Sequence, residues 1–81
     1  MALEALKNAN RVIGIKQVTK AVQKGTAGCV FLAKDADERV VAPLRALCEA
    51  EAVTIENEAT MSEIGDACSI EVGAAAAAVL R

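Results

Sequence analysis

The first third of the chain combines two helical patterns with one short apolar stretch. Residues 2–10 place leucines on one side of a short amphipathic helix and polar residues on the other. Residues 12–13 suit a short strand, and Gly14 is typical of a turn. The period then becomes helical until Gly25, in the position where glycine favours a helix end. The pattern predicts a helix, a strand and a second helix.

The middle of the chain begins with a continuous apolar run over residues 29–33, which is typical of a strand buried on both faces. Acidic residues follow this run and can cap the next helix. Pro43 is tolerated best in the first turn of a helix. We therefore predict a short helical turn over residues 37–41 and a main helix over residues 43–51.

The last third contains one clear helix start and one ambiguous segment. Residues 53–55 suit a short strand, and Thr60 to Glu63 has the spacing of a capping box, which predicts a helix running toward Ala67. Residues 72–80 are rich in alanine, which favours a helix, but their apolar character suits a buried strand equally well. Periodicity does not decide between the two structures.

Strands and helices alternate along the whole chain, with no repeat or linker between them. Alternation of this kind is typical of a sheet covered by helices on both faces. We therefore expect one α/β domain over residues 1–81. The expected fold is a three-layer α/β/α sandwich with a mixed sheet of about four strands.

Composition excludes several classes of protein. The chain has 81 residues, of which 54% are hydrophobic, so it is expected to fold as a globular domain. No apolar run reaches the length of a membrane span, and the start lacks the layout of a secretory signal. These features favour a soluble cytoplasmic protein. Phe31 is the one aromatic residue, which argues against base recognition by aromatic stacking.

Cysteine and histidine usage gives little support to metal or acid–base chemistry. The sequence has three cysteines, an odd number, and no histidine, so a four-ligand zinc site is not expected. Cysteines of this kind are typically reduced, buried apolar residues. Catalysis has few candidate groups. We expect no metal, no cofactor and no enzymatic activity.

Charge is divided unevenly along the chain, although the net charge is −2. Residues 1–34 carry six basic residues and one acidic residue, a net charge of +5. Residues 35–81 carry three basic and ten acidic residues, a net charge of −7. A polyanion could bind the positive half, but an ordinary uneven surface would give the same sequence pattern.

The most suggestive segment for binding runs from Gly14 to Lys20. A glycine before a helix lets a ligand approach the backbone, and a helix N-terminus presents free N–H groups. Lys16 and Lys20 share a helix face, and Gln17 is a neighbour of Lys20. Lysine and glutamine can contact base edges, and lysine can contact phosphates. A solvated helix face is the alternative interpretation.

A second candidate is the acidic group of Asp35, Asp37 and Glu38, which follows the predicted buried strand. Carboxylates in this position could bind magnesium in a small hydrolase. Helix capping explains the same residues more simply.

Four segments in order relate the sequence to a known family: Gly14 to Lys20, Lys34 to Asp37, residues 47–49, and Ile64 to Ala76. With them, nearly the full chain resembles the ribosomal-protein family of L-seven-Ae and L-thirty-e type, particularly its short bacterial members. The resemblance implies the α/β/α sandwich and makes residues 72–80 a buried strand. It also implies binding to the kink-turn, a sharply bent RNA helix with tandem sheared G·A pairs.

The resemblance assigns a role to each candidate residue. The helix start would reach guanine edges and phosphates, an acidic residue would hold a looped-out nucleotide, and an apolar loop would pack on the extruded base. The residues so implied are Gly14, Lys16, Gln17, Lys20, Lys34, Asp37, Ile70, Glu71 and Val72. Two positions depart from common family patterns: Lys16-Gln17 stand where many archaeal members have Asn-Glu, and Ser69 stands where glycine is usual.

The expected partner is therefore structured RNA, in the ribosome or in another transcript, bound by a monomer. The alternative is a protein–protein adaptor that keeps the fold without binding RNA. Its docking surface would be the acidic half of the chain, around Glu49, Glu51, Glu56 and Glu58.

Overall fold

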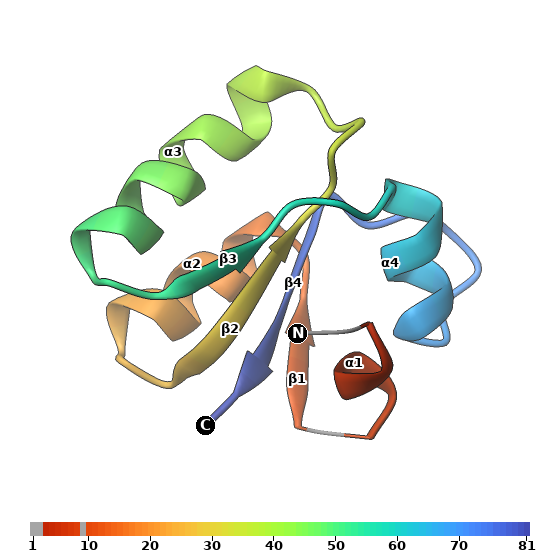
Figure 1. Cartoon of the computed structure of the whole chain (residues 1–81), viewed down its shortest axis with the longest axis horizontal. Coiled ribbons are helices and arrows are strands. Elements are labelled where there is room, and N and C mark those ends of the chain that lie inside the picture. The colour runs from red at the N-terminus through yellow and green to blue at the C-terminus, as the bar shows by residue number, and fades with distance from the viewer. Residues whose placement is uncertain (1–2, 9) are drawn as a thin grey trace.

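The computed structural model describes residues 3–8 and 10–81, and these form eight elements (Figure 1). Their bounds are α1 Glu4–Asn8, β1 Arg11–Ile13, α2 Ile15–Gln23, β2 Ala27–Leu32, α3 Glu38–Ala50, β3 Thr54–Glu56, α4 Met61–Ala67 and β4 Ala76–Leu80. The order of elements matches the sequence prediction, apart from the corrections given below.

The four strands form one mixed sheet in the order β1-β4-β2-β3. The last strand of the chain, β4, lies between β1 and β2 and is antiparallel to both, whereas β2 and β3 are parallel. Figure 1 shows α2 and α3 on one side of this sheet and α1 and α4 on the other. The expected three-layer sandwich is confirmed.

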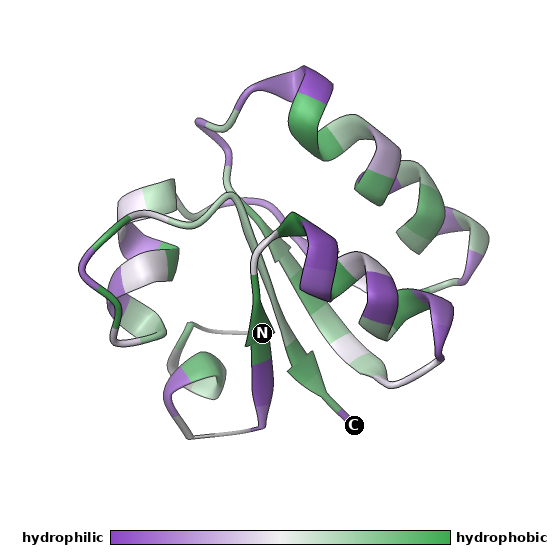
Figure 2. Ribbon diagram, turned by 180° about the vertical axis from the view of Figure 1, so that it is seen from behind, coloured by the Kyte–Doolittle hydropathy of each residue, from purple (hydrophilic) through white to green (hydrophobic). Residues whose placement is uncertain are grey.

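Two hydrophobic cores fill the spaces between the sheet and its helices, because successive side chains of a strand point to opposite faces. In β2, Val30 and Leu32 pack with the α2 and α3 side, whereas Cys29 and Phe31 pack with the α1 and α4 side. Figure 2 shows the same division in the helices, whose apolar residues turn toward the sheet. A strand buried on both faces therefore explains the continuous apolar run of the sequence.

The ambiguous alanine-rich segment is a strand. Ala76, Ala77 and Ala78 are each 0% exposed, and β4 is hydrogen-bonded to strands on both of its edges. Burial and backbone pairing thus outweigh the helix propensity of alanine. The strand begins at Ala76, so the prediction that it begins at residue 72 is wrong: residues 72–75 belong to the loop that leads into it.

The region around Pro43 differs from the prediction. A single helix, α3, runs through this residue, instead of a short turn followed by a separate helix. Proline removes the N–H that would bond the carbonyl of Arg39, but both residues are exposed, so water can take its place. The inner face of α3, with Val41, Leu44 and Cys48 buried, keeps the helix on the sheet.

Three smaller predictions, on the cysteines, the capping box and Gly25, are confirmed. All three cysteines are free and buried. The capping box at the start of α4 is present, with Thr60 as its N-cap. Gly25 follows the end of α2 with a positive φ of 75°. Within the described part of the chain, no helix has the length and apolar character needed to cross a membrane.

Candidate functional site

Three of the segments predicted to bind a ligand meet at one end of the sheet. The Gly14 N–H donates to the Ala76 carbonyl at 2.8 Å, which joins the end of β1 to the start of β4. The Ala33 N–H donates to the Ala75 carbonyl at 2.9 Å, which joins the end of β2 to the same place. The start of α2, the loop after β2 and the end of the α4–β4 loop therefore lie next to one another.

The start of α2 depends on the backbone of Gly14. This residue is the N-cap, with φ 97° and ψ 151°, a region that is essentially restricted to glycine. It provides no side-chain cap, so the first N–H groups of α2 have no side-chain acceptor from the N-cap. A Cβ atom at this position would have no neighbour within 4 Å, which leaves the approach to these groups open.

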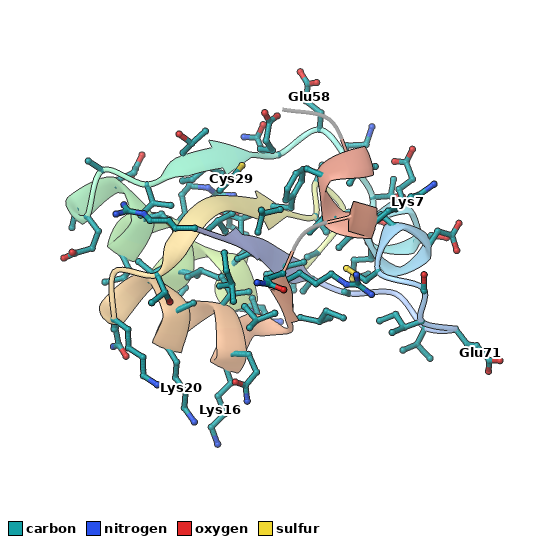
Figure 3. The ribbon with its side chains drawn as sticks, turned by 90° about the horizontal axis from the view of Figure 1, so that it is seen from below. Lys7, Lys16, Lys20, Cys29, Glu58 and Glu71 are labelled. Carbon is teal, nitrogen blue, oxygen red and sulfur yellow. The ribbon has the colours of Figure 1, made fainter. Side chains whose placement is uncertain are left out.

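The polar face of α2 carries the predicted binding side chains. Lys16, Gln17 and Lys20 are all exposed, while Val18 and Val22 on the opposite face are buried in the core. Figure 3 shows Lys16 and Lys20 side by side, pointing away from the sheet in the same direction. The structure therefore places two cations and one amide on a single exposed helix face, directly after the turn at Gly14.

The loop after β2 is held against the start of α4. The exposed Lys34 donates its N–H to the Ala59 carbonyl at 2.8 Å. Oδ1 of Asp35 accepts from the Met61 N–H at 2.8 Å, which provides α4 with a cap in addition to Thr60. Lys34 thus lies at the same end of the sheet as Gly14, with its side chain in solvent.

Asp37 caps α3 and is paired with Arg39. Oδ1 accepts from the Arg39 backbone N–H at 2.9 Å, and Oδ2 lies 2.9 Å from Nη2 of the same arginine. The Arg39 guanidinium beside it holds the pKa of the Asp37 carboxyl below its usual value. Asp37 caps the next helix, as predicted, whereas Asp35 accepts from the start of α4 instead, so capping accounts for both carboxylates. Among the described residues, no group of acidic and cysteine side chains is arranged to hold a metal ion.

The three predicted residues of the α4–β4 loop differ in exposure. Ile70 is half-buried and packs against the core between the sheet and α4. Glu71 is exposed and, in Figure 3, points in a different direction from Lys16 and Lys20. Val72 is 71% exposed, although it is a large apolar residue. The apolar surface that this loop presents to a ligand is therefore mainly that of Val72.

The loop is bound to α4 by residues that the sequence analysis did not assign to the site. The Ile70 N–H donates to the Gly65 carbonyl, and the Ala74 N–H donates to the Met61 carbonyl, each at 3.1 Å. A Cβ atom on Gly73 would lie 3.1 Å from that of Met61, so glycine permits the close approach. The sequence could have indicated this packing through Gly65 and Gly73, because glycine marks places where the backbone passes close to its neighbours.

Comparison with known proteins supports a single family. The sequence pattern of the ribosomal protein L7Ae/L30e/S12e/Gadd45 family matches residues 2–81. The chain is 46% identical over 68 residues to RNA-binding protein TTE2299 of Caldanaerobacter subterraneus subsp. tengcongensis, covering 84% of this chain and 83% of the relative. It is 38% identical to RNA-binding protein YbxF of Geobacillus stearothermophilus, with complete coverage of both chains.

Longer proteins are also similar to this chain. The chain is 39% identical over 84 residues to large ribosomal subunit protein eL8 of Haloquadratum walsbyi, covering 98% of this chain and 70% of the relative. The structure of the Giardia lamblia 15.5kD RNA binding protein has a TM-score of 0.91 and 26% identity, covering 98% of this chain and 70% of the other. The names of these relatives are those of ribosomal and RNA-binding proteins and not those of enzymes.

Proposed function

Because this chain belongs to the ribosomal protein L7Ae/L30e/S12e/Gadd45 family, we propose that it is an RNA-binding protein that recognises the kink-turn. The observation that carries the proposal is the hydrogen bond from Gly14 to Ala76. It joins the N-cap of α2 to the end of the α4–β4 loop. A bent RNA could contact both of these at once.

Lys16, Gln17 and Lys20 would contact the RNA where the bend opens the groove. Lysine donates to guanine O6 and N7 or to phosphate oxygens, and the glutamine amide both donates and accepts at a base edge. The uncapped N–H groups at the start of α2 attract phosphate oxygens to the same place. Lys34, exposed at the same end of the sheet, would add a phosphate contact.

The α4–β4 loop would recognise the shape of the kink. Val72 is exposed on a loop whose backbone is bonded to α4, so it can pack on an extruded base with little further ordering. Ile70 would support the loop from within, and Glu71 would lie at its edge. Asp37 keeps about one free acceptor position, because a carboxylate can accept about four hydrogen bonds and Arg39 donates three of them. It could therefore still hold a nucleotide that loops out.

The proposed complex contains one protein chain and one structured RNA. The chain carries a net charge of −2, so attraction to phosphates is expected only at residues 1–34, which carry a net charge of +5. Base-edge contacts and the shape of the bent RNA would then supply much of the specificity. We propose that the protein acts as a monomer in the cytoplasm, on ribosomal RNA or on another transcript that contains a kink-turn.

Titration of two RNAs tests this function. One contains a kink-turn, and the other is the same RNA with the tandem G·A pairs replaced by Watson–Crick pairs. We expect the wild-type protein to bind the kink-turn RNA more tightly. Gln17→Ala should weaken this binding by about fivefold or more, since a good base-edge contact contributes about 1–3 kcal/mol. Lys20→Ala should weaken binding and lower the salt slope by about 1.

Lys7→Ala is the matched control, because Lys7 is an exposed lysine on α1. Figure 3 shows it far from Lys16 and Lys20. Its replacement should leave the affinity nearly unchanged. Equal affinity of the wild-type protein for both RNAs would contradict the proposal. Capture of a protein partner that is insensitive to ribonuclease, together with that result, would favour the adaptor.

A further inference from the structure

Arg11 contributes to the positive charge of the first 34 residues, but its side chain is directed into the protein. It is half-buried on β1, and its guanidinium donates to two backbone carbonyls. Nη1 donates to the Leu6 carbonyl at 2.9 Å, and Nη2 donates to the Cys68 carbonyl at 2.8 Å. One side chain therefore joins three elements, namely β1, α1 and the end of α4.

Both acceptors are carbonyls at helix C-terminal ends. Leu6 lies in the last turn of α1, and Cys68 is the C-cap of α4. Carbonyls in these positions have no partner within their own helix, and they carry the negative end of the helix dipole. A guanidinium has the planar, two-pronged geometry that suits two such acceptors, whereas an ammonium group does not. Figure 1 shows α1 and α4 adjacent on the same side of the sheet.

The Cys68 carbonyl is the point at which the α4–β4 loop leaves the helix. The next residue, Ser69, has a positive φ of 61°, which turns the chain away from the helix axis. The exposed Val72 follows three residues later. The orientation of the Cys68 carbonyl therefore helps to set the direction in which the loop starts.

We propose that Arg11 is a positioning residue that fixes the α4–β4 loop for contact with RNA, although it does not touch the RNA itself. This inference rests on the proposed function. It makes the contact of the α4–β4 loop with RNA depend on a residue of β1, which lies outside the predicted site. Arg11 acts by holding the end of α4 against α1, so that Val72 is presented in one orientation.

A double-mutant cycle tests the assignment, with the wild-type protein, Arg11→Lys, Val72→Ala and the double variant titrated with kink-turn RNA. Arg11→Lys keeps the charge and removes the two-pronged contact. We expect it to weaken binding about fivefold in the wild-type background and less than about twofold in the Val72→Ala background, since residues that act through one another are not additive. Equal losses in both backgrounds would overturn the proposal.

Salt dependence separates positioning from direct contact. The slope of affinity against salt concentration should be the same for Arg11→Lys and for the wild-type protein, because neither loses a phosphate contact. The same titration of Arg11→Met, which removes the charge, should also leave the slope unchanged. A shallower slope for Arg11→Met would show that Arg11 contacts phosphate and would overturn the proposal.

Amide hydrogen exchange examines the loop without RNA. The Ile70 N–H, bonded to Gly65, should exchange at least about tenfold faster in Arg11→Lys, while the Val30 amide in the core should change much less. Equal acceleration at both amides would mean that Arg11 only stabilises the whole domain, and the proposal would fail. If the wild-type protein does not prefer kink-turn RNA, the proposed function fails, and the exchange result still decides whether Arg11 holds the loop.

Discussion

The carbonyl oxygen of Val72 lies directly against the α-carbon of Gly65. A Cβ atom built on Gly65 would be 2.3 Å from this oxygen, closer than real Cβ contacts. Gly65 is buried in the middle of α4, so the helix itself gives no reason for a glycine here. The close contact supplies the reason: it lets the loop that carries Val72 pack onto the helix.

Gly65→Ala should therefore destabilise the protein. Helix propensity alone favours alanine over glycine by about 1 kcal/mol. In this structure, however, the new methyl group would collide with the backbone of Val72. Overpacking of this kind typically costs about 1–3 kcal/mol, which outweighs the gain in propensity. We expect a lower free energy of unfolding in urea denaturation, and weaker binding to kink-turn RNA because the loop is displaced.

Asp66→Ala provides the comparison for this substitution. Asp66 is the next residue of α4 and is exposed, so mainly helix propensity acts there. Its replacement should stabilise the protein slightly or leave it unchanged. A Gly65→Ala variant as stable as the wild-type protein would show that the loop moves aside at little cost.

Gly14→Ala should lower both stability and RNA affinity. The residue has φ 97° and ψ 151°, a conformation that costs a residue with a Cβ atom about 1–3 kcal/mol. No atom lies within 4 Å of the new methyl group, so strain and not collision is the cause. Relief of the strain would rotate the start of α2 away from the Ala76 carbonyl. Urea denaturation and RNA titration measure the two effects.

Gly25→Ala is the matched control, because Gly25 also has a positive φ, of 75°, and open space around it. It follows the other end of α2. The variant should lose stability and keep its RNA affinity. Loss of affinity in both variants to the same extent would show that binding follows the stability of α2 and not the geometry of its first turn.

Most of the fold was predictable because periodicity and capping reflect local physics. The helices and strands before α3, and the capping box at Thr60, follow from such patterns. The position of Pro43 inside α3 did not follow, since the packing of Val41 and Leu44 on the sheet outweighs the local penalty. The alanine-rich strand needed knowledge of pairing on both edges, which no local pattern contains.

The candidate site was predictable to a smaller degree. The exposed face of α2 follows from helical periodicity, so Lys16 and Lys20 could be placed side by side. The role of Arg11 could not, because its two acceptors are backbone carbonyls, and one of them is 57 residues away in the sequence. In the sequence Arg11 is one more positive charge, whereas in the structure its guanidinium joins α1 to α4.

The capping box at the start of α4 should make stability depend on pH. The hydrogen bond from the Thr60 N–H lowers the pKa of the Glu63 carboxyl below its usual value. A carboxyl whose pKa is lower in the folded than in the unfolded state stabilises the protein above its unfolded pKa. That stabilisation is lost as the pH falls through the folded pKa.

Glu63→Gln keeps the shape of the capping box and removes the charge. We expect the wild-type protein to be more stable than this variant at neutral pH, and the difference to shrink as the pH falls below the unperturbed value of 4.5. Urea denaturation at a series of pH values measures this difference. If the difference in the free energy of unfolding between the two proteins grew as the pH fell, the assignment of the pKa shift to the folded state would be contradicted.

Val72→Ala should weaken binding to kink-turn RNA with little effect on stability. Val72 is 71% exposed, so the folded protein loses little buried surface when the side chain is shortened. Packing on an extruded base would bury this side chain only in the complex. Loss of two methyl groups from such a contact is expected to weaken binding about tenfold, at about 0.8 kcal/mol for each buried carbon. Calorimetric titration with kink-turn RNA measures the change.

Val40→Ala tests whether exposed valines in general affect RNA binding. Val40 is 45% exposed in the first turn of α3, on a different element from Val72. Its replacement should leave RNA affinity unchanged within error. Because the two substitutions are chemically identical, a difference between them must come from position. Equal losses would show that the RNA covers α3 as well, and equal affinity of both variants with the wild-type protein would remove Val72 from the proposed site.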